Sequence, residues 1–439
     1  MLFIKQKSPI LFNMTKTLNN DIKSIVQRQR LDTLDRGVFN AVAREATQRL
    51  VDVLDSSLVK AILGPRRSGK STLALLALRN KRFGYINLED ELIPSAIDGD
   101  ELVAAIDAVY GDVDYYLFDE IQNLERWEQF INRIHRQRKN IIITGSNSKL
   151  LSDELASALT GRHIAIQLLP LSYKELSDAK ELQPNLDFER YLVQGGFPDV
   201  VLHNENYRNY LRSLWDSVVL KDILKRYRVK NLAGLNGVLS LMIGSMGSRF
   251  SARSLERALN GLVSIASIQK FIYYARQAYL AFDLPCFSLK AKLRNKADRK
   301  AYLIDNGFYS AMRVGASKDW SKYLENLVFI ELLRRGFEPG LDLFYYLTAS
   351  GYEVDFLLRR GHTNIELVQV SWDLSSQKTL QREVRSLIQA SKELNLKSLT
   401  VITRALEREI SSDGLVIRVV PIEKWLTQDV GSNRIGPNY

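Results

Sequence analysis

Cysteine is almost absent from this chain of 439 residues: Cys286 stands alone, so no disulfide can form within the chain. A protein without disulfides fits a reducing compartment, and we expect a cytoplasmic location. No apolar run reaches the about 18 residues that a membrane-spanning helix needs, so no membrane association is expected. The first residues lack the apolar core of a signal peptide, and translation could begin at Met1 or at Met14.

Acidic residues are scarce in one part of an otherwise ordinary soluble composition. Residues 207–300 contain 18 Lys and Arg but five Asp and Glu, a net charge of +13, whereas the whole chain carries +11. Because the excess falls in one predicted module, it predicts an anionic partner such as DNA, bound through residues 207–300. A basic surface that only keeps the protein in solution is the alternative. The length fits two to four domains.

A phosphate-binding loop is indicated near residue 64. Residues 58–63 are an apolar run, residues 64–72 follow the pattern G-x-x-x-x-G-K-S, and a segment rich in Leu and Ala follows. Strand, glycine-rich loop and helix in this order hold phosphates with backbone N–H groups and a helix N-terminus. Lys70 should reach the β- and γ-phosphates and Ser71 should hold Mg²⁺. The predicted ligands are ATP and Mg²⁺, and the predicted nucleotide-binding residues of the loop are Gly64, Pro65, Arg66, Arg67, Ser68, Gly69, Lys70, Ser71 and Thr72.

Two acids, Asp119 and Glu120, end an apolar run that begins at Tyr115. Downstream of a phosphate-binding loop, Asp119 is expected to hold Mg²⁺ through water, and Glu120 to orient or deprotonate the attacking water. Further apolar runs at 83–88, 141–146 and 163–168 alternate with helical patterns, which indicates a parallel sheet with covered faces. Ser146 and Asn147, after the run 141–146, could contact the γ-phosphate or the water as a sensor, or could cap the next helix.

Arg162 directly precedes the run 163–168, where it would face away from its own phosphate-binding loop. It could enter the site of a neighbouring subunit and stabilise charge in the transition state, or it could be a surface arginine. The predicted catalytic residues are therefore Lys70, Glu120 and Arg162.

This order of motifs resembles AAA-type ATPases. Segments 151–155, 159–162 and 169–172, with Gly195-Gly196-Phe197-Pro198, are similar to a large family of poorly characterised bacterial and archaeal ATPases that carry a C-terminal domain of unknown function. The resemblance covers nearly everything after Phe39. It implies a ring or a nucleotide-gated switch, and hence a homo-oligomer, a hexamer being one form, with active sites shared between subunits. It also implies that Pro198 reads the nucleotide state at the base; an ordinary inter-domain turn is the alternative.

The basic region predicts a second module. Helical patterns at 210–227, 235–246, 251–256 and 267–282 precede strands at 286–289 and 300–304. The arrangement resembles a winged helix, whose recognition helix can lie in the major groove of DNA. In many AAA proteins such a module only packs against its neighbours, which is the alternative. The residues expected on the exposed side of the recognition helix are Lys270, Tyr273, Tyr274, Arg276 and Gln277.

The C-terminal region resembles the restriction-endonuclease-like core, with a helix at 322–335, strands at 343–347, 353–358 and 363–370, a helix at 378–394 and a strand at 399–403. Such nucleases need an Asp, then acid-x-Lys on the next strand, to hold Mg²⁺. Asp355 supplies the first, but the triplet is Gln369-Val370-Ser371, and Glu366 should point to the other face of its strand. We therefore predict a nuclease-like fold that binds partners or subunits without cleaving.

The predicted fold class is α/β: a parallel-sheet AAA-type P-loop core with a helical lid, a winged-helix middle domain and a C-terminal α/β restriction-endonuclease-like domain. The predicted boundaries are 1–35 for a leader, 36–170 for the core, 171–206 for the lid, 207–315 for the middle domain and 316–439 for the C-terminal domain. The favoured function is a Mg²⁺-dependent ATPase that couples hydrolysis to DNA binding or remodelling, of the translocation or branch-migration class. The rival is a nucleotide-operated signalling switch that recruits a protein effector, and a third hypothesis is an ATP-regulated nuclease.

Overall fold

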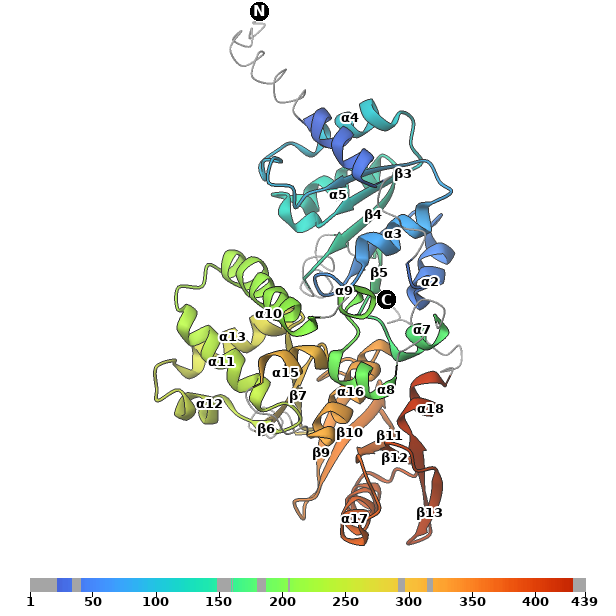
Figure 1. Ribbon diagram of the computed structural model, residues 1–439, viewed down its shortest axis with the longest axis vertical. Helices are drawn as coiled ribbons and strands as arrows, with labels where there is room; N and C mark the ends of the chain where they lie inside the picture. The colour runs from blue at the N-terminus through green and yellow to red at the C-terminus, as the bar shows by residue number, and fades with distance from the viewer. Residues whose placement is uncertain are drawn as a thin grey trace, which may run out of the picture. The chain divides into compact units, whose positions relative to one another are not determined.

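The computed structural model describes residues 22–33, 41–147, 159, 161–179, 187–203, 206–290, 297–313 and 319–428. The chain forms two compact units that divide between Leu168 and Leu169 (Figure 1). The regions expected at 171–206, 207–315 and 316–439 all belong to the second unit. Met14 and the segment 151–155 lie outside the described residues. Within the described ranges, no helix has the length and apolarity to span a bilayer.

A five-stranded parallel sheet, with the strand order β2-β3-β4-β1-β5, forms the centre of the first unit. Its strands are β1 (Val59–Leu63), β2 (Phe83–Asn87), β3 (Tyr115–Asp119), β4 (Asn140–Gly145) and β5 (His163–Gln167). Because the strands are parallel, their carboxyl ends meet at one edge of the sheet: Asn87 pairs with Asp119, and Leu63 pairs with Gly145. The polar loops predicted to bind nucleotide all follow these ends.

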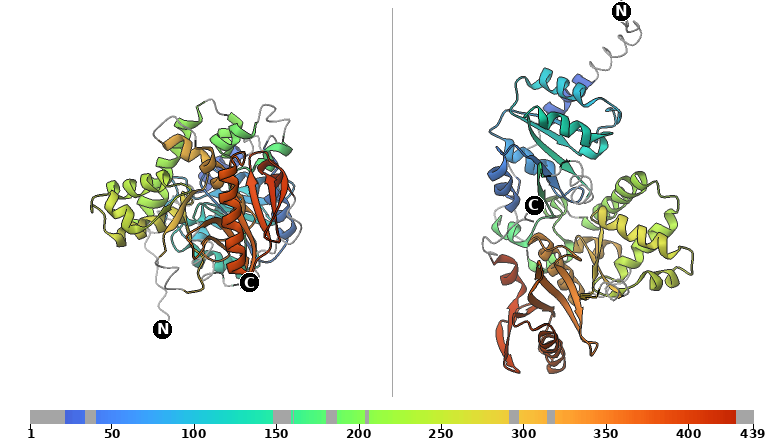
Figure 2. Two further views of the ribbon diagram at one scale, coloured as in Figure 1. Left: turned by 90° about the horizontal axis from the view of Figure 1, so that it is seen from below. Right: turned by 180° about the vertical axis from the view of Figure 1, so that it is seen from behind.

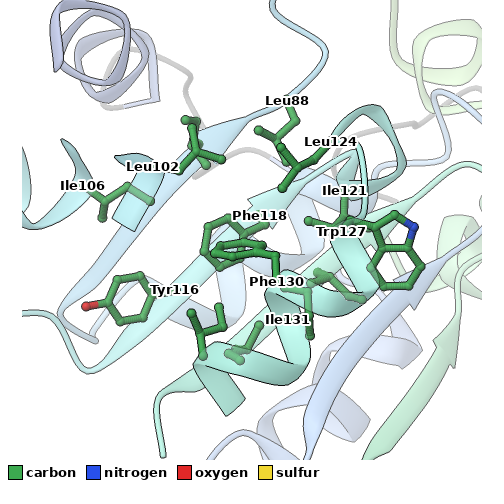
Figure 3. Close-up of a cluster of buried hydrophobic side chains, with 14 of the residues drawn as sticks. Leu88, Leu102, Ile106, Tyr116, Phe118, Ile121, Leu124, Trp127, Phe130 and Ile131 are labelled. Carbon is green, nitrogen blue, oxygen red and sulfur yellow. The ribbon is translucent and has the colours of Figure 1, made fainter. Parts of the chain in front are cut away.

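Helices cover both faces of this sheet, as the alternating pattern predicted. α5 (Trp127–Arg136) buries apolar residues spaced three and four apart, and with α4 (Gly99–Tyr110) it covers one face. Figure 3 shows Phe118 of β3 against Phe130 of α5, with ring centroids 5.1 Å apart and the rings nearly perpendicular. α2 (Glu45–Val53) and α3 (Lys70–Leu78) cover the opposite face.

A helix over residues 22–33 belongs to this core, although the sequence suggested a separate leader. Ile22, Ile25 and Val26 are buried in the same apolar cluster as α4 and α5. Gln29 binds the backbone at the end of β2: its Nε2 donates to Asn87 O at 3.2 Å, and its Oε1 accepts from Asn87 N at 2.8 Å. The helix therefore fixes the loop that follows β2.

The second unit begins with helices and a short sheet (Figure 2). Its helices are α7 (Tyr173–Asp178), α8 (Phe188–Gln194), α9 (Pro198–His203), α10 (Tyr207–Val218), α11 (Leu232–Gly244), α12 (Ala252–Ala258), α13 (Ile265–Gln277) and α15 (Asn306–Met312), and a π-helical segment over Val219–Lys225 extends α10. The sheet has the antiparallel order β6-β8-β7, with β6 (Arg249–Phe250), β7 (Ala281–Pro285) and β8 (Arg299–Leu303).

Three details of this region differ from the sequence prediction. The helix expected to reach Phe282 ends at Gln277, and the strand lies at Ala281–Pro285, before the expected 286–289. Tyr279 has a φ of 53°, and this left-handed residue turns the chain from α13 into β7. Gln277, expected on the exposed side of α13, is buried.

A six-stranded sheet completes the second unit, with the order β13-β14-β12-β11-β10-β9. The elements are α16 (Trp320–Arg334), β9 (Leu343–Leu347), β10 (Glu353–Arg360), β11 (Thr363–Val370), α17 (Gln377–Leu394), β12 (Leu399–Thr403), β13 (Arg408–Ser412), β14 (Leu415–Pro421) and α18 (Ile422–Thr427). The order from α16 to β12 is the predicted αβββαβ, and the hairpin β13–β14 was not predicted.

Candidate nucleotide-binding site

The predicted phosphate-binding loop joins β1 to α3, in the strand-loop-helix context that the sequence indicated. A Cβ at Gly64 would lie 1.9 Å from Leu168 O, so only glycine lets the chain leave β1 at this point. Gly69 (φ 94°) and Arg67 (φ 66°) are left-handed, and Ser68 between them is not. This alternation is the backbone pattern of anion-binding nests, and the loop ends at the N-terminus of α3, where the helix dipole also favours an anion.

Lys70, the first residue of α3, is buried and faces Glu120. Its Nζ lies 3.3 Å from Glu120 Oε1 and donates to Pro65 O at 3.1 Å. Burial alone would raise the pKa of Glu120, but Lys70, Arg66 and hydrogen bonds from Gln122 and Ser146 outweigh it and lower the pKa to about 2. Glu120 is therefore ionised at neutral pH and can accept a hydrogen bond from water.

Asp119, at the end of β3, accepts hydrogen bonds from three hydroxyl groups. Ser71 Oγ donates to its Oδ2 at 2.7 Å, Tyr85 OH donates to the same oxygen at 3.1 Å, and Thr144 Oγ1 donates to Oδ1. Burial and the neighbouring Glu120 carboxylate raise the pKa of Asp119. Thr144 Oγ1 also accepts from Glu120 N at 2.9 Å, so it fixes both acids. Tyr85 and Thr144 were not assigned roles from the sequence. The position of Thr144 near the end of β4 was a usable signal, whereas Tyr85 lies in the middle of β2.

Ser146 and Asn147 follow β4 and are buried beside the acids. Gln122 Nε2 donates to Ser146 Oγ at 3.3 Å and to Glu120, and this bridge places Ser146 next to the expected attacking water. The helix that these residues were alternatively expected to cap would lie at 148–158, outside the described residues.

Three arginines lie in or beside the loop, and their surroundings differ from those of Lys70. Arg66 Nη1 lies 2.6 Å from Glu89 Oε1, just after β2, whereas Arg67 is exposed. Arg44, which precedes α2, donates from Nη1 to Ser68 O at 2.8 Å. The role of Arg44 could not be read from the sequence because it lies 20 residues before Gly64, outside the motif.

The residues present fit a nucleoside triphosphate with Mg²⁺. Ser68 Oγ is buried in the loop and, within the described ranges, has no hydrogen-bond partner, so a polar atom is left for a ligand. Ser71 and Asp119 supply hard oxygen donors already within 2.7 Å of each other, and Mg²⁺ in nucleotide sites is held in this way by one or two protein oxygens with phosphates and water.

Of the other predicted residues, Arg162 lies away from this cluster and Pro198 belongs to the second unit. Arg162 is exposed and precedes His163, which pairs with Val59 at the start of β1. Gly64 follows Val59 by five residues, about 17 Å along the strand at about 3.3 Å per residue, so Arg162 is at the opposite end of the sheet from the loop. Pro198 begins α9 in the second unit and is not among the residues that the first unit brings together.

The predicted nuclease-like site of the second unit contains a lysine at its centre. Lys300 of β8 is buried, and its Nζ lies 2.6 Å from Glu325 Oε1, 3.0 Å from Glu353 Oε1 and 2.9 Å from Asp355 Oδ1. In the part of the chain that the structure describes, no group of three His, Cys, Asp or Glu could hold a metal ion. Lys300 therefore compensates carboxylates that a metal would balance in a nuclease.

Gln369, which stands where the nuclease-like interpretation expects an acid, lies in the same group. Gln369 contacts Asp355 and Glu383: its Oε1 accepts from Asp355 N at 3.2 Å, and its Nε2 donates to Glu383 Oε2 at 2.8 Å. Glu366 accepts from Thr400 Oγ1 and Arg418, away from this group. Its orientation to the other face of the strand is thus confirmed.

Comparison with known proteins gives the family. Residues 56–177 match the model of an AAA domain, residues 185–319 a domain of unknown function (DUF8612) and residues 321–425 another (DUF4143). An uncharacterised protein of Methanocaldococcus jannaschii is 33% identical over 84% of this chain and 88% of its own length. An uncharacterised protein of Haemophilus influenzae is 30% identical over 87% of this chain and 97% of its own length.

Among solved structures, a Walker-type ATPase of Pyrococcus abyssi aligns with 63% of this chain and 97% of its own, at 15% identity and a TM-score of 0.45. The family assignment depends on the sequence matches, which extend from the phosphate-binding loop almost to the end of the described residues. The chain therefore belongs to the same family as these archaeal and bacterial proteins, and its first unit is an AAA-type P-loop domain.

Proposed function

We propose that the protein is a Mg²⁺-dependent ATPase. The observation that carries the proposal is the convergence of Lys70, Ser71, Asp119 and Glu120 at the carboxyl edge of one parallel sheet, within the distances given above. Phosphate-binding loop, metal-binding acid and water-activating acid are the parts that P-loop hydrolases use.

In the proposed reaction, Glu120 accepts a hydrogen bond from water and directs its oxygen to the γ-phosphorus. The new phosphorus–oxygen bond forms as the bond to the β–γ bridging oxygen breaks, and the electron pair of that bond stays on ADP. One proton of the water passes through Glu120 to the released phosphate. Mg²⁺ held by Ser71 and Asp119 would neutralise charge on the β- and γ-oxygens.

We further propose that the active form is a homo-oligomer in which Arg162 completes a neighbour's site. Its exposure, and its place at the far end of the sheet from its own loop, support a role in trans rather than in cis. An arginine supplied in this way stabilises the charge that develops on the transferred phosphoryl group.

DNA is the proposed partner of the second unit, through residues 207–300. The order α11-β6-α12-α13-β7-β8 and the sheet order β6-β8-β7 support the winged-helix interpretation. Lys225, Arg228, Lys230 and Lys270 are exposed and, within the described residues, make no ion pair, so their charge is available to phosphates. Arg276 and Arg299 instead form ion pairs with Asp283, and the negative charge of Asp283 lowers the net positive charge of this surface.

The test measures ATP turnover with and without four-way, forked and single-stranded DNA. Lys70→Ala should abolish nucleotide binding and turnover, whereas Lys81→Ala, at an exposed lysine outside the site, should match the wild type. Unchanged turnover in Lys70→Ala would contradict the proposed ATPase. Turnover that ignores every DNA would contradict coupling to DNA and would favour the signalling switch.

DNA binding is tested by charge reversal. The triple variant Lys225→Glu, Lys230→Glu, Lys270→Glu should weaken DNA binding and reduce the slope of log affinity against log salt by about 0.9 for each DNA phosphate that a lysine no longer neutralises. The matched control reverses Lys378, Lys392 and Lys397, three exposed lysines of the six-stranded sheet domain. Equal effects of both triple variants would show an unspecific charge effect and contradict this interface.

A further inference from the structure

The side chain of Arg66 extends away from the phosphate-binding loop and forms an ion pair with Glu89, with Nη1 2.6 Å from Oε1. The two side chains are 12% and 29% exposed, so the pair is largely removed from water. Surface ion pairs contribute little, but a pair held in a partly buried place fixes the position of both groups. Glu89 N also donates to Asn87 Oδ1 at 2.9 Å, which fixes Glu89 on the end of β2.

The strand order determines where the Arg66 guanidinium lies. β1, which leads into the loop, and β2, which leads to Glu89, are separated by β3 and β4. At about 4.8 Å per strand the separation is about 14 Å, so the ion pair must cross over the ends of β3 and β4. Those ends carry Asp119, Glu120 and Ser146.

The chemistry of arginine suits this placement. The guanidinium stays protonated, and its planar group carries five N–H donors, of which one on Nη1 donates to Glu89 Oε1. Because Glu89 holds this charge across the ends of β3 and β4, the charge lies over the strand ends that carry Asp119 and Glu120.

We propose that Arg66 stabilises transition-state charge on the γ-phosphoryl group in cis, and that Glu89 is a positioning residue that holds the Arg66 guanidinium over the site. The inference rests on the ATPase function proposed above. Arg66 would act on the bond-breaking step from within the subunit, whereas Arg162 would act from a neighbour. The two arginines would therefore differ in whether their loss is corrected by mixing subunits.

The experiment compares kcat, ADP affinity and the affinity for ADP with aluminium fluoride, a mimic of the transferred group, in the full-length protein. Arg66→Ala should lower kcat by about 100-fold or more, and should weaken ADP–aluminium fluoride binding by a similar factor, with ADP affinity unchanged. Arg66→Lys keeps the charge but not the planar fork, and should also lose kcat. It provides a second variant if Arg66→Ala does not fold.

The test of Glu89 is a double-mutant cycle. Glu89→Ala should lower kcat by about 10-fold, Glu89→Gln should lose less because its amide oxygen still accepts from Arg66, and Arg66→Ala combined with Glu89→Ala should be no slower than Arg66→Ala alone. The control is Glu91→Ala, at an exposed carboxylate of the same loop, which should match the wild type.

The outcomes separate this inference from the function on which it rests. Absence of turnover in the wild type would overturn both. If the wild type turns over ATP normally, three results would overturn only the inference. These are an unchanged kcat in Arg66→Ala, equal losses of ADP affinity and kcat in that variant, and additive effects of Arg66→Ala and Glu89→Ala on kcat. A rise in kcat in Glu89→Ala would also overturn it, since the ion pair would then restrain Arg66.

Discussion

The ammonium of Lys300 lies 2.9 Å from the carboxylate of Asp355, although the two residues belong to different sheets of the second unit. Burial would lower the pKa of Lys300, but Asp355 and Glu325 outweigh it, and the pKa is raised well above its ordinary value. The lysine is thus charged and joins the short sheet to the six-stranded sheet.

Lys300→Met should destabilise the second unit by about 3–5 kcal/mol, because it leaves buried carboxylates without their cation. Urea unfolding of the full chain, followed by intrinsic fluorescence, measures the change. Lys392→Met removes half of an exposed pair with Asp413 and should cost at most about 1 kcal/mol. Equal losses in the two variants would show that Lys300 does not hold the sheets together.

No Mg²⁺- or Mn²⁺-dependent nicking of supercoiled plasmid is expected from the wild type. In the nuclease-like interpretation, Gln369 and Ser371 stand where the acid and the lysine would be, and the Lys300 ammonium lies 2.9 Å from the Asp355 carboxylate. Gel assays with each metal and with EDTA provide the measurement. Nicking that requires metal and disappears in Asp355→Ala would contradict the prediction of an inactive nuclease-like domain.

Stability of the second unit should depend on pH through Asp305. Burial raises the pKa of this carboxyl to about 7, although it accepts backbone N–H groups from Gly196 and Gly307 at 2.8 and 2.7 Å. Because the folded-state pKa lies above the ordinary 3.8, the folded protein binds the extra proton. Its stabilising contribution is present below about pH 4 and is lost as the pH rises through about 7.

Between pH 5 and 7.5 the contribution of Asp305 should fall by about 2.5 kcal/mol, which urea unfolding at the two pH values would measure. Asp305→Asn cannot titrate, so its free energy of unfolding should lack this part of the decline, even though one hydrogen bond is lost at both pH values. An equal decline in the variant and the wild type would show that another group titrates.

Mixing subunits tests Arg162. Arg162→Ala alone should lower turnover by about 10³-fold or more, and Lys70→Ala alone should be inactive. Mixed and reassembled, the two variants should recover part of the wild-type rate, because a Lys70 site can then receive Arg162 from its neighbour. Arg79→Ala, at an exposed arginine of the same unit, is the control. Failure to recover after verified mixing would contradict a role in trans.

The sequence predicts the local parts of the site and not the contacts that depend on strand order. The spacing of Gly64, Lys70 and Ser71, and the acids after an apolar run, identify a strand-loop-helix and a strand end. Glu89 lies 23 residues from Arg66, and nothing in the sequence indicates that β3 and β4 separate their strands. The pairing of Arg66 with Glu89 could therefore be found only in the folded sheet.

The same limit applies to the second unit. Asp355 was identified from its strand, but Lys300 lies 55 residues away in a basic segment, where a solvent-facing or DNA-binding role was the natural expectation. The end of α13 was misplaced because the apolar spacing continues through Phe282, while the left-handed turn at Tyr279 has no glycine to signal it.

The helix over residues 22–33 has a practical consequence for cloning. Gln29 forms hydrogen bonds with the backbone N–H and C=O of Asn87 and donates to Asp90 at 3.0 Å. Glu89 lies between these two residues, so Gln29 holds the chain on both sides of it. An expression product that starts just before the phosphate-binding loop would lose these hydrogen bonds and, with them, the support of the segment that holds Arg66. Under the proposed ATPase function, kinetic constants from such a fragment would understate the activity of the full chain.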